Sequence, residues 1–218
     1  MLDGYYRNSI NVIFEAINTT FLDSPRFTES TDVFELITDL RSQMNAGSID
    51  FIKDRRALLH FISGRDFDGN YVGLAYKGSV CDSSGYNVGV TQLAGKNIAY
   101  TALIAAHELG HNLGADHDGE FGGVGRGCGN GYVMEAYLDF ESPPDSFSSC
   151  SIDEIHSTIS ALPDPAACFK YPAKISITAD AGNASTGVPF TELTNRYSVN
   201  VEQGSQALES VSVGGALG

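Results

Sequence analysis

The sequence predicts an α/β (α+β) domain built on a mixed sheet and followed by a short β-rich tail. Two observations support this class. Short β-rich apolar runs alternate with amphipathic helical segments over the first 170 residues, and helical periodicity is absent from residue 171 onward. We therefore expect one domain over residues 1–170 and the start of a small β-rich accessory domain over residues 171–218.

Four segments of the first domain have the composition of strands, because valine, isoleucine and aromatic residues gather or alternate in them. The run at 57–62 is continuous and is expected to be buried. Loops are predicted at 18–30, which contains Pro25, and at the glycine-rich stretch 119–131. The predicted strands are residues 10–17, 57–62, 72–80 and 87–92, with two more in the tail at 174–178 and 197–201.

Three segments have the apolar spacing of helices. Each is preceded by a residue whose side chain can cap a helix N-terminus, and each is followed by glycine or proline. The predicted helices run from Thr31-Asp32 to about Asn45, from Asn97 or Thr101 to Gly114, and from Ser151 to about Leu162.

Composition excludes some classes of protein. The chain has 218 residues, with 13 Lys and Arg against 27 Asp and Glu, for a formal net charge of −14. This acidic balance argues against a nucleic-acid-binding protein, which needs clustered basic residues. No apolar run approaches the roughly 18 residues of a membrane span, so no membrane-spanning segment is expected. The composition does not indicate an oligomeric state.

The segment from His107 to Asp118 has the spacing of a catalytic zinc site. His107 and His111 lie four residues apart, so a helix presents both on one face. Gly114 allows the helix to end and the chain to turn back, which lets His117 supply a third ligand. Three neutral histidines with one open position are typical of catalytic zinc. Glu108, next to the first ligand, can reach a metal-bound water as general base.

This pattern, His-Glu-Leu-Gly-His-Asn-Leu-Gly-Ala-Asp-His, resembles the zinc motif of the metzincin metalloproteases. Asp118, directly after the third histidine, resembles the adamalysin/reprolysin branch, as do residues 73–76, 78–82 and 88–90. The resemblance covers roughly residues 30–170. It implies a twisted mixed sheet, a zinc-bearing active-site helix and a small C-terminal subdomain. It also implies a secreted zinc endopeptidase that acts on protein or peptide substrates.

The resemblance implies further features. Met134 is expected in a turn beneath the zinc, although Cys128 lies farther from it than the family's cysteine usually does. The strand at about residues 72–78 would bind the substrate backbone by β-addition, and a calcium site would use Asp54. The family's first strand and long helix are expected to be missing, since only nine residues precede the segment at 10–17.

Four widely spaced cysteines, with no Cys-x-x-Cys pair, predict two disulfides and an oxidising compartment. The sequence alone leaves all three pairings open. The family resemblance implies the pairs Cys81–Cys168 and Cys128–Cys150. An extracellular location requires an export signal upstream, because residues 1–7 do not begin a signal peptide.

Two other interpretations remain open from the sequence. The first is a catalytically silent zinc-binding interaction module on the same fold, against which the intact Glu108 and histidines argue. The second is another metzincin branch, which the disulfide map would distinguish. The remaining histidines are predicted to have no direct role, with His60 packed in the core and His156 exposed.

Overall fold

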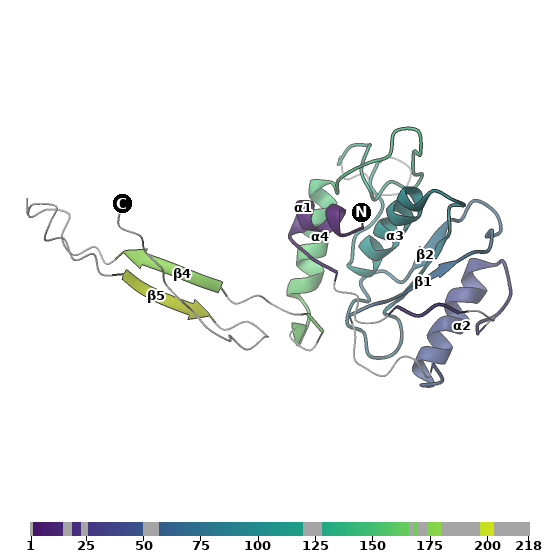
Figure 1. Ribbon diagram of the computed structural model, residues 1–218, viewed down its shortest axis with the longest axis horizontal. Helices are drawn as coiled ribbons and strands as arrows, with labels where there is room; N and C mark the ends of the chain where they lie inside the picture. The colour runs from purple at the N-terminus through teal and green to yellow at the C-terminus, as the bar shows by residue number, and fades with distance from the viewer. Residues whose placement is uncertain are drawn as a thin grey trace, which may run out of the picture. The chain divides into compact units, whose positions relative to one another are not determined.

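The computed structural model describes residues 2–14, 19–22, 26–49, 57–119, 128–165, 168–169, 174–179 and 197–202. The chain divides into two compact units, Met1–Ala167 and Cys168–Gly218. The first unit contains α1 (Leu2–Ile10), α2 (Val33–Asn45), β1 (Leu59–Ser63), β2 (Gly73–Ala75), β3 (Val88–Gln92), α3 (Ile98–Asn112) and α4 (Ser149–Ser160) (Figure 1). The second contains β4 (Lys174–Ala179) and β5 (Tyr197–Glu202).

The first unit is built on a small mixed sheet with the strand order β1-β3-β2. β1 runs parallel to β3, with Leu59 opposite Val88, whereas β2 runs antiparallel to β3, with Leu74 opposite Val90. The central strand β3 is buried on both faces, as its apolar sequence requires. The predicted α/β class with a mixed sheet is therefore confirmed.

Two helices cover the opposite faces of this sheet (Figure 1). α2 lies on the face that carries Val88 and Val90, and its buried residues join them in one apolar core with partly buried Phe61 and Leu74. α3 lies on the other face, where the paired strand residues are small: Gly73 and Ala75 of β2 are opposite Thr91 and Gly89 of β3. Small residues let the helix approach the sheet closely.

The helices predicted on the two faces are confirmed, with small differences at the ends of α3. Asp32 caps α2, and its side chain accepts a hydrogen bond from the Phe34 amide at 2.8 Å. The predicted apolar face of α2 is buried at Val33, Leu36, Ile37 and Leu40. α3 begins after Asn97, whose side-chain oxygen accepts hydrogen bonds from the amides of Ala99 and Tyr100. The alternative start at Thr101 is therefore wrong.

The last helix begins two residues earlier than predicted. Ser148, not Ser151, is the N-cap of α4, and the Ser148 hydroxyl accepts a bond from the Ser151 amide at 3.1 Å. Both serines have the chemistry of a cap, so the sequence could not decide between them. The helix ends at Ser160, before the two prolines at 163 and 165.

The predicted strand at residues 10–17 is wrong over its described part. Ile10 ends helix α1, and residues 11–14 belong to no strand, while 15–17 lie outside the described residues. Tyr6 and Ile10, one helical turn apart, are buried, and the Tyr6 hydroxyl donates to the Ala106 carbonyl at 2.6 Å. The described residues after Ile10 instead bond back to α1: the Val12 amide donates to the Tyr6 carbonyl at 3.4 Å and the Phe14 amide to the Asp3 carboxylate at 3.2 Å.

Two of the predicted strands differ in length or burial. β1 is not fully buried, since Ile62 is 52% exposed on this outer strand. The predicted strand at 72–80 is reduced to β2, because the chain turns at Gly78, which has a φ of 63°. The amides of Gly78 and Val80 then donate to the His111 and Asn112 carbonyls at 2.8 and 3.0 Å, which joins this turn to the end of α3.

The second unit contains the two strands expected in the tail, paired antiparallel with Ile175 opposite Val201. Of the predicted glycine-rich loop, residues 120–127 lie outside the described residues. Among the helices that the structure describes, none combines the length and the hydrophobicity needed to cross a membrane.

Candidate metal centre

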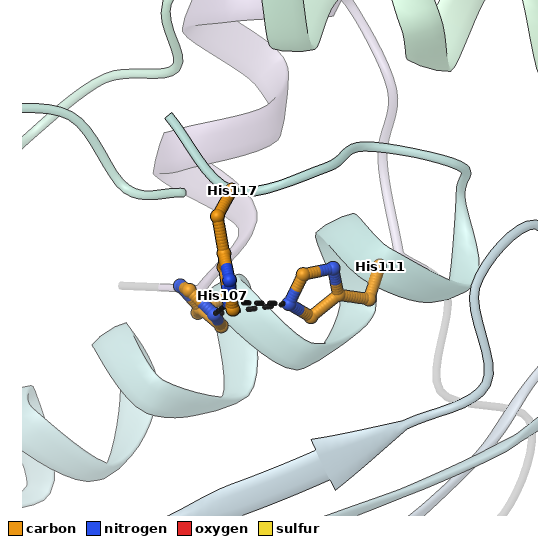
Figure 2. A group of neighbouring side chains, drawn as sticks. All are labelled: His107, His111 and His117. Atoms are coloured by element: carbon orange, nitrogen blue, oxygen red, sulfur yellow. Dashed lines mark hydrogen bonds between the residues drawn. The ribbon is translucent and has the colours of Figure 1, made fainter. Parts of the chain in front are cut away.

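Three histidine side chains converge at the C-terminal end of α3 (Figure 2). His107 and His111 come from the helix, and His117 follows the turn at Gly114, which has a φ of 109°. Their Nε2 atoms form a nearly equilateral triangle with sides of 3.0, 3.1 and 3.1 Å. Zn–N bonds of about 2.0–2.1 Å in tetrahedral geometry place two nitrogens roughly 3.3–3.4 Å apart, close to this spacing.

The outer ring nitrogens of His107 and His111 show which nitrogen of each ring carries the hydrogen. His107 Nδ1 lies 2.7 Å from the Val133 carbonyl oxygen, and His111 Nδ1 lies 2.8 Å from that of Ala115. A carbonyl oxygen only accepts, so each Nδ1 carries the hydrogen and each neutral ring turns an Nε2 lone pair inward. Burial keeps the rings neutral: it lowers the pKa of His111 to about 4 and that of His107 well below its usual range.

Inward-facing lone pairs this close together repel one another unless a cation lies between them. The donor set of three neutral imidazoles therefore fits a zinc ion. Among the described residues, this triad is also the one group of three or more potential ligands that could hold a metal. The calcium expectation gains no support, and Asp54 lies outside the described residues.

The third ligand is held by the residue that follows it. Asp118 is 6% exposed, and its amide donates to the Met134 carbonyl at 2.7 Å. Its carboxylate accepts bonds from the hydroxyls of Ser148 at 2.7 Å and Ser151 at 3.1 Å, at the start of α4. The loop that carries His117 is thus fixed to α4 through two buried charge-assisted hydrogen bonds.

Glu108 is buried between α3 and the sheet. Glu108 is 5% exposed. Burial raises the pKa of Glu108 to about 8. Its carboxylate end lies against Gly73, the first residue of β2.

The comparison with known families agrees with this geometry. The family model described as "Reprolysin (M12B) family zinc metalloprotease" matches residues 7–170, which is most of the chain. The chain belongs to the reprolysin family of zinc metalloproteases. The resemblance noted in the sequence is therefore confirmed, and zinc is the metal expected for a reprolysin.

Solved structures also match this reprolysin chain. One, titled "Structure of a chaperone-substrate complex", has 18% sequence identity and a TM-score of 0.37. The match covers 60% of this chain and 23% of that chain. A similarity of this size carries no argument about the fold or the function of the reprolysin chain.

Met134, expected beneath the metal, lies in a turn and is fully buried. Its thioether packs against Gly110 of the zinc-binding helix, where a side chain would collide with the methionine sulfur. Its neighbour Val133 supplies the carbonyl that orients His107. In this reprolysin the turn therefore contacts the helix one residue before His111 and also holds the first ligand through the backbone.

The four cysteines are all disulfide-bonded. Cys128 and Cys150 form one bridge, with their Cα atoms 6.0 Å apart, and this bridge joins the end of the glycine-rich region to the first turn of α4. The pairing of Cys81 with Cys168 remains a prediction.

Sequence reasoning missed Asn112, which fixes the end of the zinc-binding helix to the sheet. Its Nδ2 atom lies 3.0 Å from each of the Tyr76 carbonyl, the Ser79 hydroxyl and the Val88 carbonyl. Its only sequence signal was its place beside the second histidine. The carbonyls of Val133 and Ala115 could not be predicted, since every residue offers the same acceptor.

Proposed function

We propose that this chain is a zinc-dependent endopeptidase. The observation that supports this most directly is the convergence of three histidine Nε2 atoms within 3.1 Å of one another. The residue that follows the first of these histidines is the buried Glu108. His107, His111 and His117 would hold the zinc, which supplies Lewis acidity that lowers the pKa of a water and polarises the scissile carbonyl.

The chain's own residues perform the remaining steps. The carbonyls of Val133 and Ala115 keep the protons on the outer nitrogens of two ligands, so the inner nitrogens stay free to coordinate. Glu108 accepts a proton from the attacking water and donates it to the leaving amine nitrogen. Met134, packed on the zinc-binding helix, stiffens the floor of the site.

The substrate would bind in extended form along β2. This strand pairs with β3 on one side, and Gly73 at its start lies against Glu108, which brings the strand next to the site. A peptide can add to such an edge through its backbone hydrogen bonds. We assign catalysis to residues 1–170, an accessory role to residues 171–218, and an extracellular location to the whole, in keeping with the disulfide-bonded cysteines.

Replacement of the general base tests this function. Glu108→Gln keeps the shape of the side chain but removes its basicity, so zinc content should stay at one per chain while peptide cleavage falls at least about 100-fold. Cleavage of a peptide library with and without a chelator gives the baseline. Wild-type rates in the variant would refute the role of Glu108. A zinc-loaded wild-type chain that cleaves no peptide would support the silent binding module instead.

A further inference from the structure

The general base lies where β2 lacks a side chain. Gly73 is buried and pairs with Thr91 of β3. A Cβ atom built on Gly73 would lie 2.7 Å from Cγ and 2.8 Å from Cδ of Glu108, and closer still to Oε1. Real Cβ atoms essentially never approach other heavy atoms within 3.0 Å. The end of the Glu108 side chain therefore occupies the space that any other residue at position 73 would fill.

The backbone gives no other reason for glycine at this position. The φ of Gly73 lies outside the left-handed region, so an L-amino acid could adopt it without strain. Glycine in a strand is otherwise unfavourable, because it adds conformational entropy to the unfolded chain and packs no side chain. The structure therefore indicates one reason for glycine at position 73, which is the space that the Glu108 side chain needs.

α3 and β2 cannot move apart to make room for a larger residue at position 73. β2 is held in register with β3 through Leu74 opposite Val90. The end of α3 is held to the turn after β2 by the bonds from Gly78 and Val80 to its last carbonyls, and to β3 by the bond from Asn112 to the Val88 carbonyl. A methyl group at position 73 would therefore move the Glu108 side chain and leave the backbones in place.

We propose that Gly73 is a positioning residue for Glu108. Its missing side chain leaves the space that the Glu108 carboxylate occupies against β2, one residue after the zinc ligand His107. This inference deepens the proposed function and rests on it for its catalytic consequence. The steric contact itself is independent of catalysis, so it can be tested separately.

A matched control lies elsewhere in the same sheet region. Gly64 directly follows β1, is exposed, has no left-handed φ, and a Cβ built on it meets nothing within 4 Å. Gly64→Ala is therefore the same chemical change without the collision. It should leave zinc content and peptide cleavage unchanged.

The first experiment is a double-mutant cycle read by thermal unfolding of the full chain. Gly73→Ala should lower the unfolding midpoint by several degrees when Glu108 is present. In a Glu108→Ala background the same change should leave the midpoint unchanged or raise it, because the collision is gone. Gly64→Ala should shift the midpoint equally in both backgrounds. Equal shifts for Gly73→Ala in both backgrounds would overturn the proposal.

The second experiment separates kcat from KM. In zinc-loaded Gly73→Ala, kcat should fall at least tenfold while KM and zinc content stay within twofold of wild type, because the displaced group acts in the chemical step. An unchanged kcat would overturn the positioning role. If the wild-type chain itself cleaves no peptide, the proposed function fails, whereas the unfolding cycle still decides whether Gly73 accommodates Glu108.

Discussion

The two faces of the three-stranded sheet differ in the size and polarity of their side chains. The face under α2 presents Val88, Val90, Phe61 and Leu74 to an apolar helix. The face under α3 presents glycine, alanine and threonine from β2 and β3, with His60 of β1 opposite Gly89. One face buries large apolar groups, and the other leaves room for polar ones.

This difference assigns separate tasks to the two faces. Burial of large aliphatic side chains supplies most of the stabilising free energy in a domain. The opposite face gives up part of that burial so that α3, with Glu108 and Asn112, can lie close to the strands. Changes on the α2 face should therefore reduce stability alone, whereas changes on the α3 side should affect metal binding, catalysis or pH tolerance, with or without a loss of stability.

The largest expected effect is the loss of the third ligand. His117→Ala should lower peptide cleavage by about 1,000-fold or more and reduce zinc content, because two histidines alone leave the metal site incomplete. Metal analysis and a cleavage assay measure both. The exposed His156 on α4 provides the control, since His156→Ala should retain both zinc and activity. Full zinc occupancy in His117→Ala would contradict the ligand assignment.

Shortening a buried side chain on the α2 face should instead reduce stability and leave zinc binding intact. Leu40 is 1% exposed in the apolar core, so Leu40→Ala should lower the free energy of unfolding by about 2–5 kcal/mol. The folded fraction should still bind one zinc per chain. Denaturant unfolding together with metal analysis checks this, and zinc loss at unchanged stability would show that the two faces are not independent.

Asn112 should have an intermediate effect, because it is a polar anchor on the α3 face. Asn112→Ala leaves the Tyr76 and Val88 carbonyls without its donor and should cost about 1–3 kcal/mol of unfolding free energy. The same change at the exposed turn residue Asn70 should cost less than about 0.5 kcal/mol. Equal costs at both positions, measured by urea unfolding, would argue against the anchor.

The smallest expected effect is a pH dependence from His60. Burial lowers its pKa from 6.5 to about 4, and its Nδ1 has no hydrogen-bond partner among the described residues. Between pH 6.5 and pH 4 the unfolded chain binds a proton at His60 more readily than the folded chain does. The free energy of unfolding should therefore fall as the pH drops from about 6.5 toward 4. From pH 7 to pH 5 the loss should be about 1–2 kcal/mol.

His60→Gln provides the comparison for this prediction. The variant keeps the three zinc ligands, so their own titration cancels when its unfolding free energies at pH 7 and pH 5 are compared with those of wild type. The variant should show a smaller loss on acidification. An identical loss in both proteins would mean that His60 does not control the acid sensitivity.

Local signals predicted the parts of the structure that local chemistry decides. Asp32 and Asn97 cap their helices through their own side chains, and the three histidines converge because helical spacing and Gly114 bring them together. The strand expected at residues 10–17 is wrong over its described part because this segment bonds back to α1, through the Val12 amide to the Tyr6 carbonyl and the Phe14 amide to the Asp3 carboxylate. The β-branched residues themselves gave no sign of these partners.

The supporting residues of the site could not be predicted for the same reason. Gly73 matters because a side chain 35 positions later occupies its space. The carbonyls of Val133 and Ala115 matter through position alone, since the backbone is identical at every residue. The sequence therefore indicated which residues would bind the metal, and only the folded chain shows what holds them.

The anchoring of His117 has a consequence for how the protein matures. Asp118 depends on serines at positions 148 and 151, and the bridge from Cys128 ends at Cys150 in the same helical turn. During synthesis the two helical histidines emerge some 40 residues before these partners. A ribosome-bound chain that stops short of α4 already contains all three histidines but lacks the groups that fix the loop of His117. We therefore expect such a chain to bind zinc less tightly than the finished one.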